Sequence, residues 1–202
     1  IRWRIKNQNP PPPKDLPFAL VESGARGLRL AAVNHAARRF GLAPGQRLAD
    51  ARAQVPDLLS EFHEPDADMK SLLGLCRWLE RYSPWVAPEP ADGILLDIAG
   101  IPHLFGGEAR MLEEISGRLA AYGFTARRGA GETIGAAWAL ARYGAGRLDD
   151  LPVEALRIAG EQALTLRRLG LKTVGALLAI PRAALARRFR GETIGENVLM
   201  RL

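Results

Sequence analysis

The stretch Val86-Ala-Pro-Glu-Pro-Ala-Asp92-Gly-Ile-Leu-Leu-Asp97-Ile-Ala-Gly100 contains a short apolar run, residues 94–98, with an acidic residue inside it. An apolar run of about four to eight residues is typical of a buried strand. Apolar residues recur at helical spacing before this run, over residues 69–82, and after it, over residues 108–122. The stretch therefore predicts a strand between two amphipathic helices.

The same alternation continues on both sides of this stretch. Residues 58–62 and 124–128 predict further strands, and residues 134–143 predict a helix. Nearer the N-terminus, two strand-like runs flank the loop Glu22-Ser-Gly-Ala-Arg-Gly27, which predicts a hairpin followed by two short helices. Beyond residue 146 only short helices are predicted. The order of elements indicates an α+β fold with a helical C-terminal part, and a boundary near residues 146–150.

Composition limits the class of protein. The chain has 202 residues, 48% of them hydrophobic, which is enough for one large or two small folded units. Its formal net charge of +6 suggests a polyanionic partner, although an arginine-rich soluble protein would have the same charge. The one cysteine, Cys76, excludes a disulfide framework and is expected in the core. No apolar run is long enough to span a membrane. Residues 1–16 are proline-rich and predicted to be irregular, and we expect both ends to continue in a longer protein.

The C-terminal part carries most of the charge. Residues 151–202 hold nine basic and four acidic residues, and no acid lies between Thr165 and Arg190. Two helices around the turn Gly170-Leu-Lys-Thr-Val-Gly175 predict a helix-hairpin-helix, whose exposed backbone N–H groups bind a phosphate while nearby cations add sequence-independent affinity. A helical hairpin with a solvated basic face is the alternative. The predicted DNA-binding residues are Arg167, Arg168, Gly170, Lys172, Thr173, Gly175, Arg182, Arg187, Arg188 and Arg190.

Acidic residues offer one weak metal site. Catalysis on nucleotides commonly needs clustered carboxylates that hold two Mg²⁺ ions. Asp92 and Asp97 are the best candidates, but their odd separation would point them to opposite faces of one strand. They would then not share a metal, and Asp92 alone is a weak ligand site.

Other motifs have structural explanations. Gly129-Ala-Gly131-Glu-Thr-Ile-Gly135 could be a dinucleotide-binding turn, but a strand-to-helix turn that needs small residues explains it better. His63, Glu64, Asp66 and Asp68 could suggest a metal, but Asp66 or Asp68 is expected to cap the following helix instead. Trp78, Trp85 and Trp138 are expected in the core.

Several ordered blocks resemble the Y-family, lesion-bypass DNA polymerases. Asn34-His-Ala-Ala-Arg38-Arg-Phe-Gly41 is similar to the fingers pattern N-Y-x-A-R-x-F-G. Arg81-Tyr-Ser-Pro-Trp-Val86 through Gly100 is similar, without gaps, to the palm pattern F-S-P-x-V-E-P-x-S-x-D-E-x-Y-L-D-x-T-G. The resemblance implies fingers over residues 17–65, a palm over residues 66–146 and a helix-hairpin-helix thumb over residues 147–202.

Departures from these patterns fall on the family's catalytic positions. The Asp of the D-E pair matches Asp92, but the Glu falls on Gly93. In the fingers, Arg38 matches a triphosphate contact, whereas the partner Tyr falls on His35. A palm Lys that contacts the nucleotide falls on Ile134. The family's first metal-binding Asp would lie on a strand before residue 1. The resemblance thus implies no intact catalytic residue, with Asp92, His35 and Arg38 as remnants.

In these departures the chain resembles one subgroup of the family, the bacterial inducible-mutagenesis proteins B. The resemblance implies a cytoplasmic, DNA-binding adaptor for damage-induced (SOS) translesion synthesis, with no cofactor. It also implies partners: the sliding clamp, an error-prone replicative-type DNA polymerase and a RecA-like companion protein, bound mostly through a further C-terminal region. Two alternatives remain. One is an active error-prone polymerase that needs Mg²⁺ and recruits Glu89 or Asp97 as a second acid. The other is a general DNA-binding scaffold unrelated to polymerases.

Overall fold

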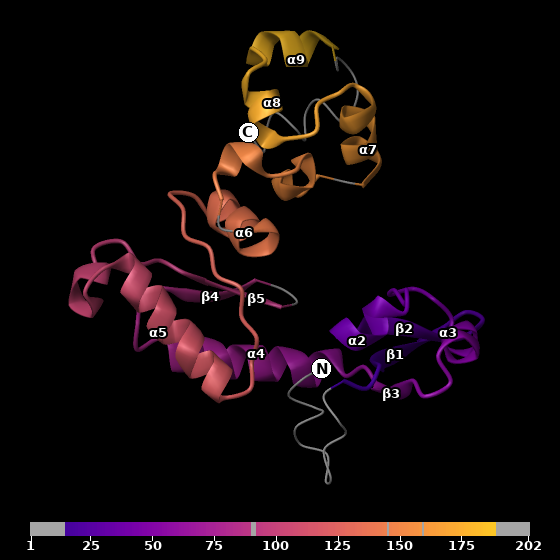
Figure 1. Ribbon diagram of the computed structural model, residues 1–202. Coiled ribbons are helices and arrows are strands. Elements are labelled where there is room, and N and C mark those ends of the chain that lie inside the picture. The colour runs from indigo at the N-terminus through magenta and orange to yellow at the C-terminus, as the bar shows by residue number, and fades with distance from the viewer. Residues whose placement is uncertain (1–14, 90–91, 145, 159, 189–202) are drawn as a thin grey trace. The chain divides into compact units, whose positions relative to one another are not determined.

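The computed structural model describes residues 15–89, 92–144, 146–158 and 160–188 (Figure 1). Most of the irregular segment predicted for residues 1–16 lies outside these ranges, as does Arg190. The chain forms two compact units, Ile1–Thr125 and Ala126–Leu202, which are described separately. Among the described residues no helix is both long enough and apolar enough to cross a membrane.

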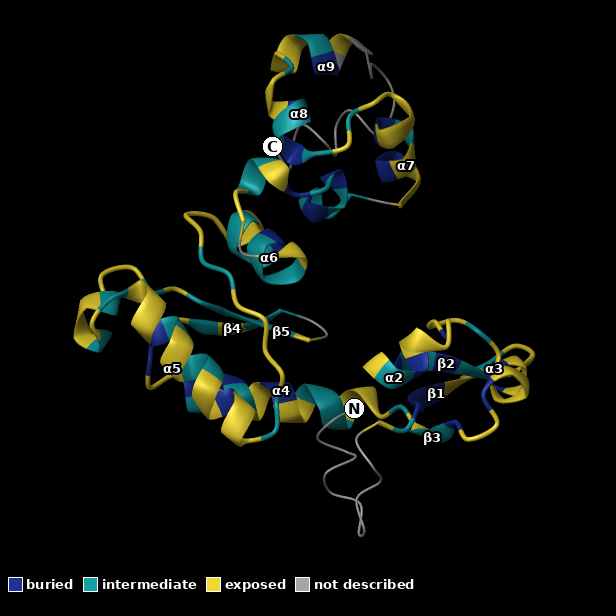
Figure 2. Ribbon diagram, viewed as in Figure 1, coloured by how far each residue is buried: buried dark blue, intermediate teal, exposed yellow. Residues whose placement is uncertain are grey.

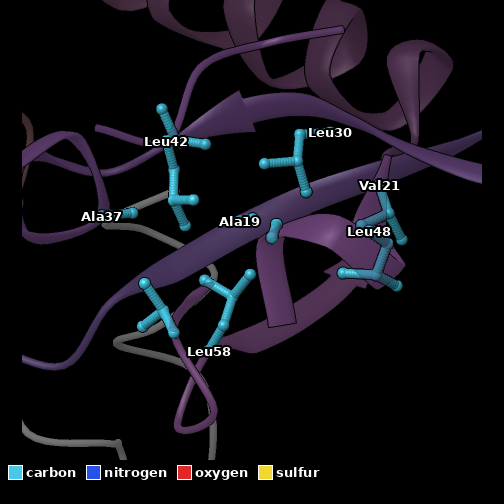
Figure 3. Packing of buried hydrophobic residues seen from close by; sticks show 10 residues of the cluster. Ala19, Val21, Leu30, Ala37, Leu42, Leu48 and Leu58 are labelled. Carbon is cyan, nitrogen blue, oxygen red and sulfur yellow. The ribbon is translucent and has the colours of Figure 1, made fainter. Parts of the chain in front are cut away.

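The first unit begins with a three-stranded sheet. β1 (Phe18–Gly24) pairs antiparallel with β2 (Gly27–Val33) and parallel with β3 (Leu59–Phe62), in the order β2-β1-β3. The short helices α2 (His35–Arg39) and α3 (Leu48–Gln54) lie between β2 and β3 in the sequence. The predicted hairpin and both helices are therefore confirmed. The hydrophobic core between this sheet and the two helices is shown in Figure 3. It consists of Ala19, Val21, Leu30, Val33, Ala37, Leu42, Leu48, Ala51, Val55 and Leu58.

The rest of the first unit surrounds a two-stranded sheet. α4 (Pro65–Leu79) is followed by β4 (Val86–Glu89) and β5 (Gly93–Leu96), which pair antiparallel. A 3-10 turn, η1 (Pro102–Phe105), then leads into α5 (Glu108–Ala121). Figure 2 shows that α4 and α5 each alternate buried and exposed residues, as amphipathic helices do. Their apolar faces pack with one face of the β4–β5 sheet around Leu79, Tyr82 and Met111.

Individual side chains confirm and correct the predicted core. Cys76 is buried in α4, as expected, and burial raises the pKa of its thiol. Trp78 packs against Tyr82, but Trp85 is 73% exposed, so its prediction as a core residue is wrong. Trp85 lies immediately before β4, where its backbone bonds to Asp97 while its side chain faces outward. A strand end fixes the backbone without burying the side chain.

Two local predictions are also wrong. Residues 124–128 form no strand: the Phe124 amide donates to the Leu119 carbonyl, continuing the end of α5, instead of joining a ladder. Neither Asp66 nor Asp68 caps α4, because Pro65 begins the helix and leaves both aspartates inside its first turn. Carboxylates in the first turn still stabilise the helix through its dipole.

The second unit is helical. It contains α6 (Ile134–Tyr143), the 3-10 turns η2 (Leu148–Asp150) and η3 (Val153–Leu156), α7 (Gly160–Arg168), α8 (Val174–Leu178) and α9 (Arg182–Arg188). Ala139 of α6 shares a core with Leu151, Ala155 and Val174. α6 thus packs with the helices that follow it, although the resemblance placed it in the palm-like segment.

Candidate functional site

The β4–β5 hairpin carries the remnant of the family's carboxylate pair. Glu89 and Gly93 are directly opposite each other in the two strands. A Cβ atom at position 93 would lie 3.0 Å from the Glu89 Cβ and 3.2 Å from its Cγ. Real Cβ atoms rarely approach so closely, so a side chain at 93 would require Glu89 to shift by a few tenths of an ångström. Asp92 is exposed in the turn immediately before Gly93.

Asp97 does not complete this pair. β5 ends at Leu96, so the rule that odd separations place residues on opposite faces does not apply to Asp97. Its backbone N–H donates to the Trp85 carbonyl, and its Oδ1 accepts a 2.9 Å hydrogen bond from the Ala99 N–H. The carboxylate therefore stabilises the turn that leaves the sheet.

A buried serine that sequence reasoning did not single out holds the two strands in place. The Ser83 hydroxyl, 2% exposed, donates to the Asp97 carbonyl and accepts from the Trp85 N–H at 3.1 Å. These bonds join the start of β4 to the end of β5. The Ser-Pro sequence at residues 83–84 was the available signal, because serine hydroxyls in turns can bond to nearby backbone groups.

The donor set does not fit the two Mg²⁺ ions that the fold implies. Two-metal sites need several carboxylates around both ions. Over the described ranges, no group of three or more His, Cys, Asp or Glu residues could hold a metal ion. Position 93 has no side chain, and Asp97 is engaged in its own turn. Asp92 is thus followed by a glycine, and its role as a remnant of the catalytic site stays a prediction.

Asn34 positions the fingers-like helix α2. Its Oδ1 accepts from the Ala37 N–H at 2.8 Å, capping the helix, and from the Phe18 N–H at 3.1 Å. Its Nδ2 donates to the Leu16 carbonyl at 2.9 Å. One side chain therefore fixes the helix start to the beginning of β1. His35 and Arg38, three residues apart on α2, are both exposed.

Replacing Asn34 with Ala is expected to destabilise this body by about 2 kcal/mol, because a helix cap and two further bonds are lost. Faster hydrogen exchange of the β1 and α2 amides would report the change. Asn34→Asp is the comparison variant, since it keeps the Oδ1 acceptor of the helix cap but replaces the Nδ2 donor with an oxygen that faces the Leu16 carbonyl, so it should loosen the start of β1 and leave α2 capped. Equal exchange rates in Asn34→Ala and the unaltered protein would show that the cap does not hold α2.

The predicted helix-hairpin-helix is present. Gly170, at φ +83°, ends α7, and the N–H groups of Gly170 and Leu171 bond to the carbonyls of Arg167 and Leu166. This is the Schellman arrangement, in which a glycine adopts the left-handed conformation. The Thr173 Oγ1 then caps α8 by accepting from the Ala176 N–H at 3.2 Å. The Val174 N–H, however, donates to the Leu151 carbonyl, so one amide at the start of α8 is already bonded.

Two further predicted DNA-binding residues have structural contacts. The Arg167 Nε lies 2.9 Å from the Glu154 Oε1, and this acid lies outside the acid-free segment. Gly175 packs on η2, since a Cβ there would lie 3.0 Å from the Asp149 backbone oxygen. Arg168, Lys172, Arg182 and Arg187 are exposed, and the side chain of Arg188 is not described. Their binding to DNA stays a prediction.

The glycine-rich motif at residues 129–135 is explained by packing. A Cβ at Gly129 would lie 2.4 Å from the Ala141 nitrogen and 2.6 Å from the Ala137 oxygen. A Cβ at Gly131 would lie 2.9 Å from that of Ala136. These glycines let the chain run directly over the backbone of α6. Ile134, where the family has a lysine, is 63% exposed at the start of α6.

Known proteins share this fold. The chain is 49% identical over 161 residues to Protein ImuB from two strains of Caulobacter vibrioides. This match covers 74% of the chain but 35% of the relative, so the chain spans about a third of the length of these curated relatives. DinB from Sulfolobus solfataricus is similar with a TM-score of 0.73 at 16% identity, over 92% of this chain and 59% of that chain. A Y-family DNA polymerase chimera of Dbh and Dpo4 has a TM-score of 0.78 at 15% identity, over 99% and 63%.

These similarities exclude a DNA-binding scaffold unrelated to polymerases. Residues 6–142, more than half of the chain, match the model of the impB/mucB/samB family. The chain therefore belongs to the impB/mucB/samB family and has the fold of Y-family DNA polymerases.

Proposed function

We propose that this chain is part of a non-catalytic Y-family polymerase homologue that binds DNA as an adaptor in damage-induced translesion synthesis. Family membership and the likeness to Protein ImuB support the link to translesion synthesis. Two of the similar structures are ternary complexes of Dbh DNA polymerase, which supports DNA as the ligand. The exposed cations Arg168, Lys172 and Arg187 would contact the DNA backbone.

The contact between Glu89 and Gly93 carries the proposal. A polymerase of this fold would place a carboxylate at position 93, but the Glu89 side chain of the neighbouring strand lies close to that space. A glutamate at 93 would need Glu89 to move. The tight contact thus supports a hairpin that has adapted to glycine at position 93.

One observation favours an active polymerase as the second candidate. Glu89 leans over Gly93 from the adjacent strand, so its carboxylate could replace the missing one and act with Asp92. In that case Mg²⁺ would be required, and Glu89 would be as important for activity as Asp92. The two candidate functions differ in whether the β4–β5 hairpin takes part in nucleotide incorporation.

Primer extension separates them. With the full-length protein, a primer–template and Mg²⁺ or Mn²⁺, we expect no incorporation above that of the Asp92→Ala variant, because glycine at position 93 removes a carboxylate that a two-metal site would use. Glu89→Gln, which keeps the packing but removes the charge, should be equally inactive. Robust incorporation that is abolished by both Asp92→Ala and Glu89→Gln would overturn the adaptor role in favour of the second candidate.

The wider partners are part of the same proposal. We expect the whole protein to bind the sliding clamp, an error-prone replicative-type DNA polymerase and a RecA-like companion protein. The chain spans 35% of the length of Protein ImuB, so much of a protein of that size would lie outside it. We therefore propose that these partners bind mostly outside residues 1–202.

A further inference from the structure

Two arginines face each other at one edge of the three-stranded sheet. Arg29 of β2 and Arg47, which immediately precedes α3, are partners in an isolated antiparallel bridge. Beside this bridge the Leu30 N–H donates to the Gln46 carbonyl at 2.9 Å and holds the two backbones together. Residues directly opposite in such a pair have neighbouring side chains, and like charges placed there destabilise the protein.

The acids around this pair do not offset the repulsion. Glu22 is opposite Arg29 in β1, but its Oε2 lies 4.0 Å from the Nδ1 of His63. Asp50 lies in the first turn of α3, three residues after Arg47. Among the described residues, neither acid forms an ion pair with either arginine. The two facing charges are therefore not neutralised within the described part of the chain.

The guanidinium donors of the pair can reach an anion. The Arg29 Nη1 donates to the Gly45 carbonyl at 3.0 Å, which restrains this side chain. That is its only hydrogen bond to another described residue, and the exposed Arg47 side chain forms none with them. A guanidinium has five N–H donors in one plane, which match phosphate oxygens in pairs. Most donors of Arg29 and all those of Arg47 are therefore unused.

Glycines leave room beside the two arginines. The Arg29 side chain lies over Gly24, since a Cβ there would be 3.0 Å from its Cδ and Nε. Gly27 and Gly45 have φ of +100° and +89°, and a Cβ at either would meet no described atom within 4 Å. Glycine occurs where a protein backbone and a ligand come close together. The surface around the pair therefore has few side chains that would obstruct an extended polyanion.

We propose that Arg29 and Arg47 form a phosphate clamp, in which the two facing guanidinium groups hold one phosphate of the DNA backbone between them. The bound anion offsets the repulsion that the free protein carries. This inference rests on the proposed DNA binding but not on the basic segment 165–190. It places a DNA contact on the three-stranded sheet and does not involve the remnants His35 and Arg38 of α2.

Salt-dependent binding tests the clamp. Anisotropy of a labelled primer–template would be measured with the full chain between about 50 and 200 mM salt. Arg29→Gln and Arg47→Gln should each lower the affinity about 8-fold near 0.1 M salt and reduce the salt slope by about 0.9, as expected for one phosphate contact. The double variant should also lose about 8-fold, because both arginines hold the same phosphate. A loss equal to the product of the two single losses would overturn the clamp in favour of two independent contacts.

Arg52→Gln is the matched control for charge. It removes the same charge from α3, but from an arginine whose Nη2 donates to the Ser60 Oγ at 3.0 Å. It should change the affinity less than about 2-fold. If both arginine variants of the pair behave like Arg52→Gln while the unaltered chain binds DNA, only the clamp is wrong. If the unaltered chain does not bind DNA, the proposed function and the clamp are both wrong.

Thermal stability separates a ligand site from a structural role. Arg47→Gln removes one of two facing like charges, and the Arg47 side chain forms no cap bond to α3. The Tm without DNA should therefore be unchanged or higher, although DNA binding is weaker. A lower Tm together with weaker binding would show that Arg47 acts through the fold and would overturn the clamp. Arg47→Gln decides this even if Arg29→Gln, which also loses the bond to Gly45, fails to fold.

A parallel titration with a labelled deoxynucleoside triphosphate covers the other source of phosphate. Nucleotide binding that is unaffected by Arg47→Gln, together with weaker DNA binding, is the expected result. Loss of nucleotide binding in Arg29→Gln and Arg47→Gln with unchanged DNA affinity would overturn the assignment to the DNA backbone.

Discussion

Reversing the charge of Arg168 and Lys172 together is expected to lower the affinity of the full chain for duplex DNA about 100-fold at ~0.1 M salt. Both side chains are exposed beside the turn that joins α7 to α8. Each phosphate contact releases about 0.9 counterion, so losing two contacts accounts for about 60-fold, and repulsion by the new carboxylates adds to it. The salt slope should fall by about two.

Arg167 is the control for this experiment. It neighbours Arg168 in the sequence, but its guanidinium is paired with Glu154 at 2.9 Å. Arg167→Gln should therefore weaken DNA binding much less than Arg168→Gln. Arg187→Glu with Arg188→Glu tests the distal end of the same segment and should also weaken binding strongly. Unchanged affinity in both double variants would show that the basic segment is only a solvated face.

Replacing Gly129 with Ala is expected to destabilise the second unit by about 3 kcal/mol, because the new methyl group would overlap the backbone of α6. The predicted Cβ position lies 2.4 Å from the Ala141 nitrogen, and a helix backbone cannot move aside as a flexible side chain can. Hydrogen exchange of the α6 amides should become much faster. Gly135→Ala, within α6, is the matched control, since its Cβ would make only an ordinary van der Waals contact with the Thr133 Oγ1 at 4.0 Å, and it should be neutral or stabilise by about 0.5 kcal/mol.

This pair of variants also separates packing from ligand binding. If Gly129→Ala folds as stably as the unaltered chain, the close approach to α6 is wrong and the glycine-rich motif needs another explanation. If the variant is destabilised and Gly135→Ala is not, the motif is required for packing. A pure loss of stability would agree with the absence of a dinucleotide site at this turn.

Much of the fold could be predicted where local sequence and burial agree. The β1–β2 hairpin followed from apolar runs around a glycine-bearing loop. Gly170 was predicted at the turn between α7 and α8, where its φ of +83° requires a residue without a Cβ. In these places the residue type itself encodes the backbone conformation.

The failures come from contacts that local patterns do not contain. Residues 124–128 look like a strand, but a strand forms only where a partner ladder is available, and the Phe124 amide bonds to the Leu119 carbonyl instead. The ion pair of Arg167 with Glu154 was not predictable from the charge pattern, because Glu154 lies outside the acid-free segment 165–190. Glu89 opposite Gly93 depends on the register of β4 and β5, and β4 was not predicted. The sequence motif located Asp92 and Gly93. The close contact between Glu89 and Gly93 could be seen only from the pairing of β4 with β5.

The central claim is that this protein holds DNA without extending it. One sample tests both parts: the full-length protein with a labelled primer–template, Mg²⁺ and all four deoxynucleoside triphosphates, with binding read by anisotropy and extension read on a gel. We predict saturable, salt-dependent binding with no extended primer at full occupancy. Extension of the bound primer that disappears in Glu89→Gln would contradict the account, and so would the absence of any binding.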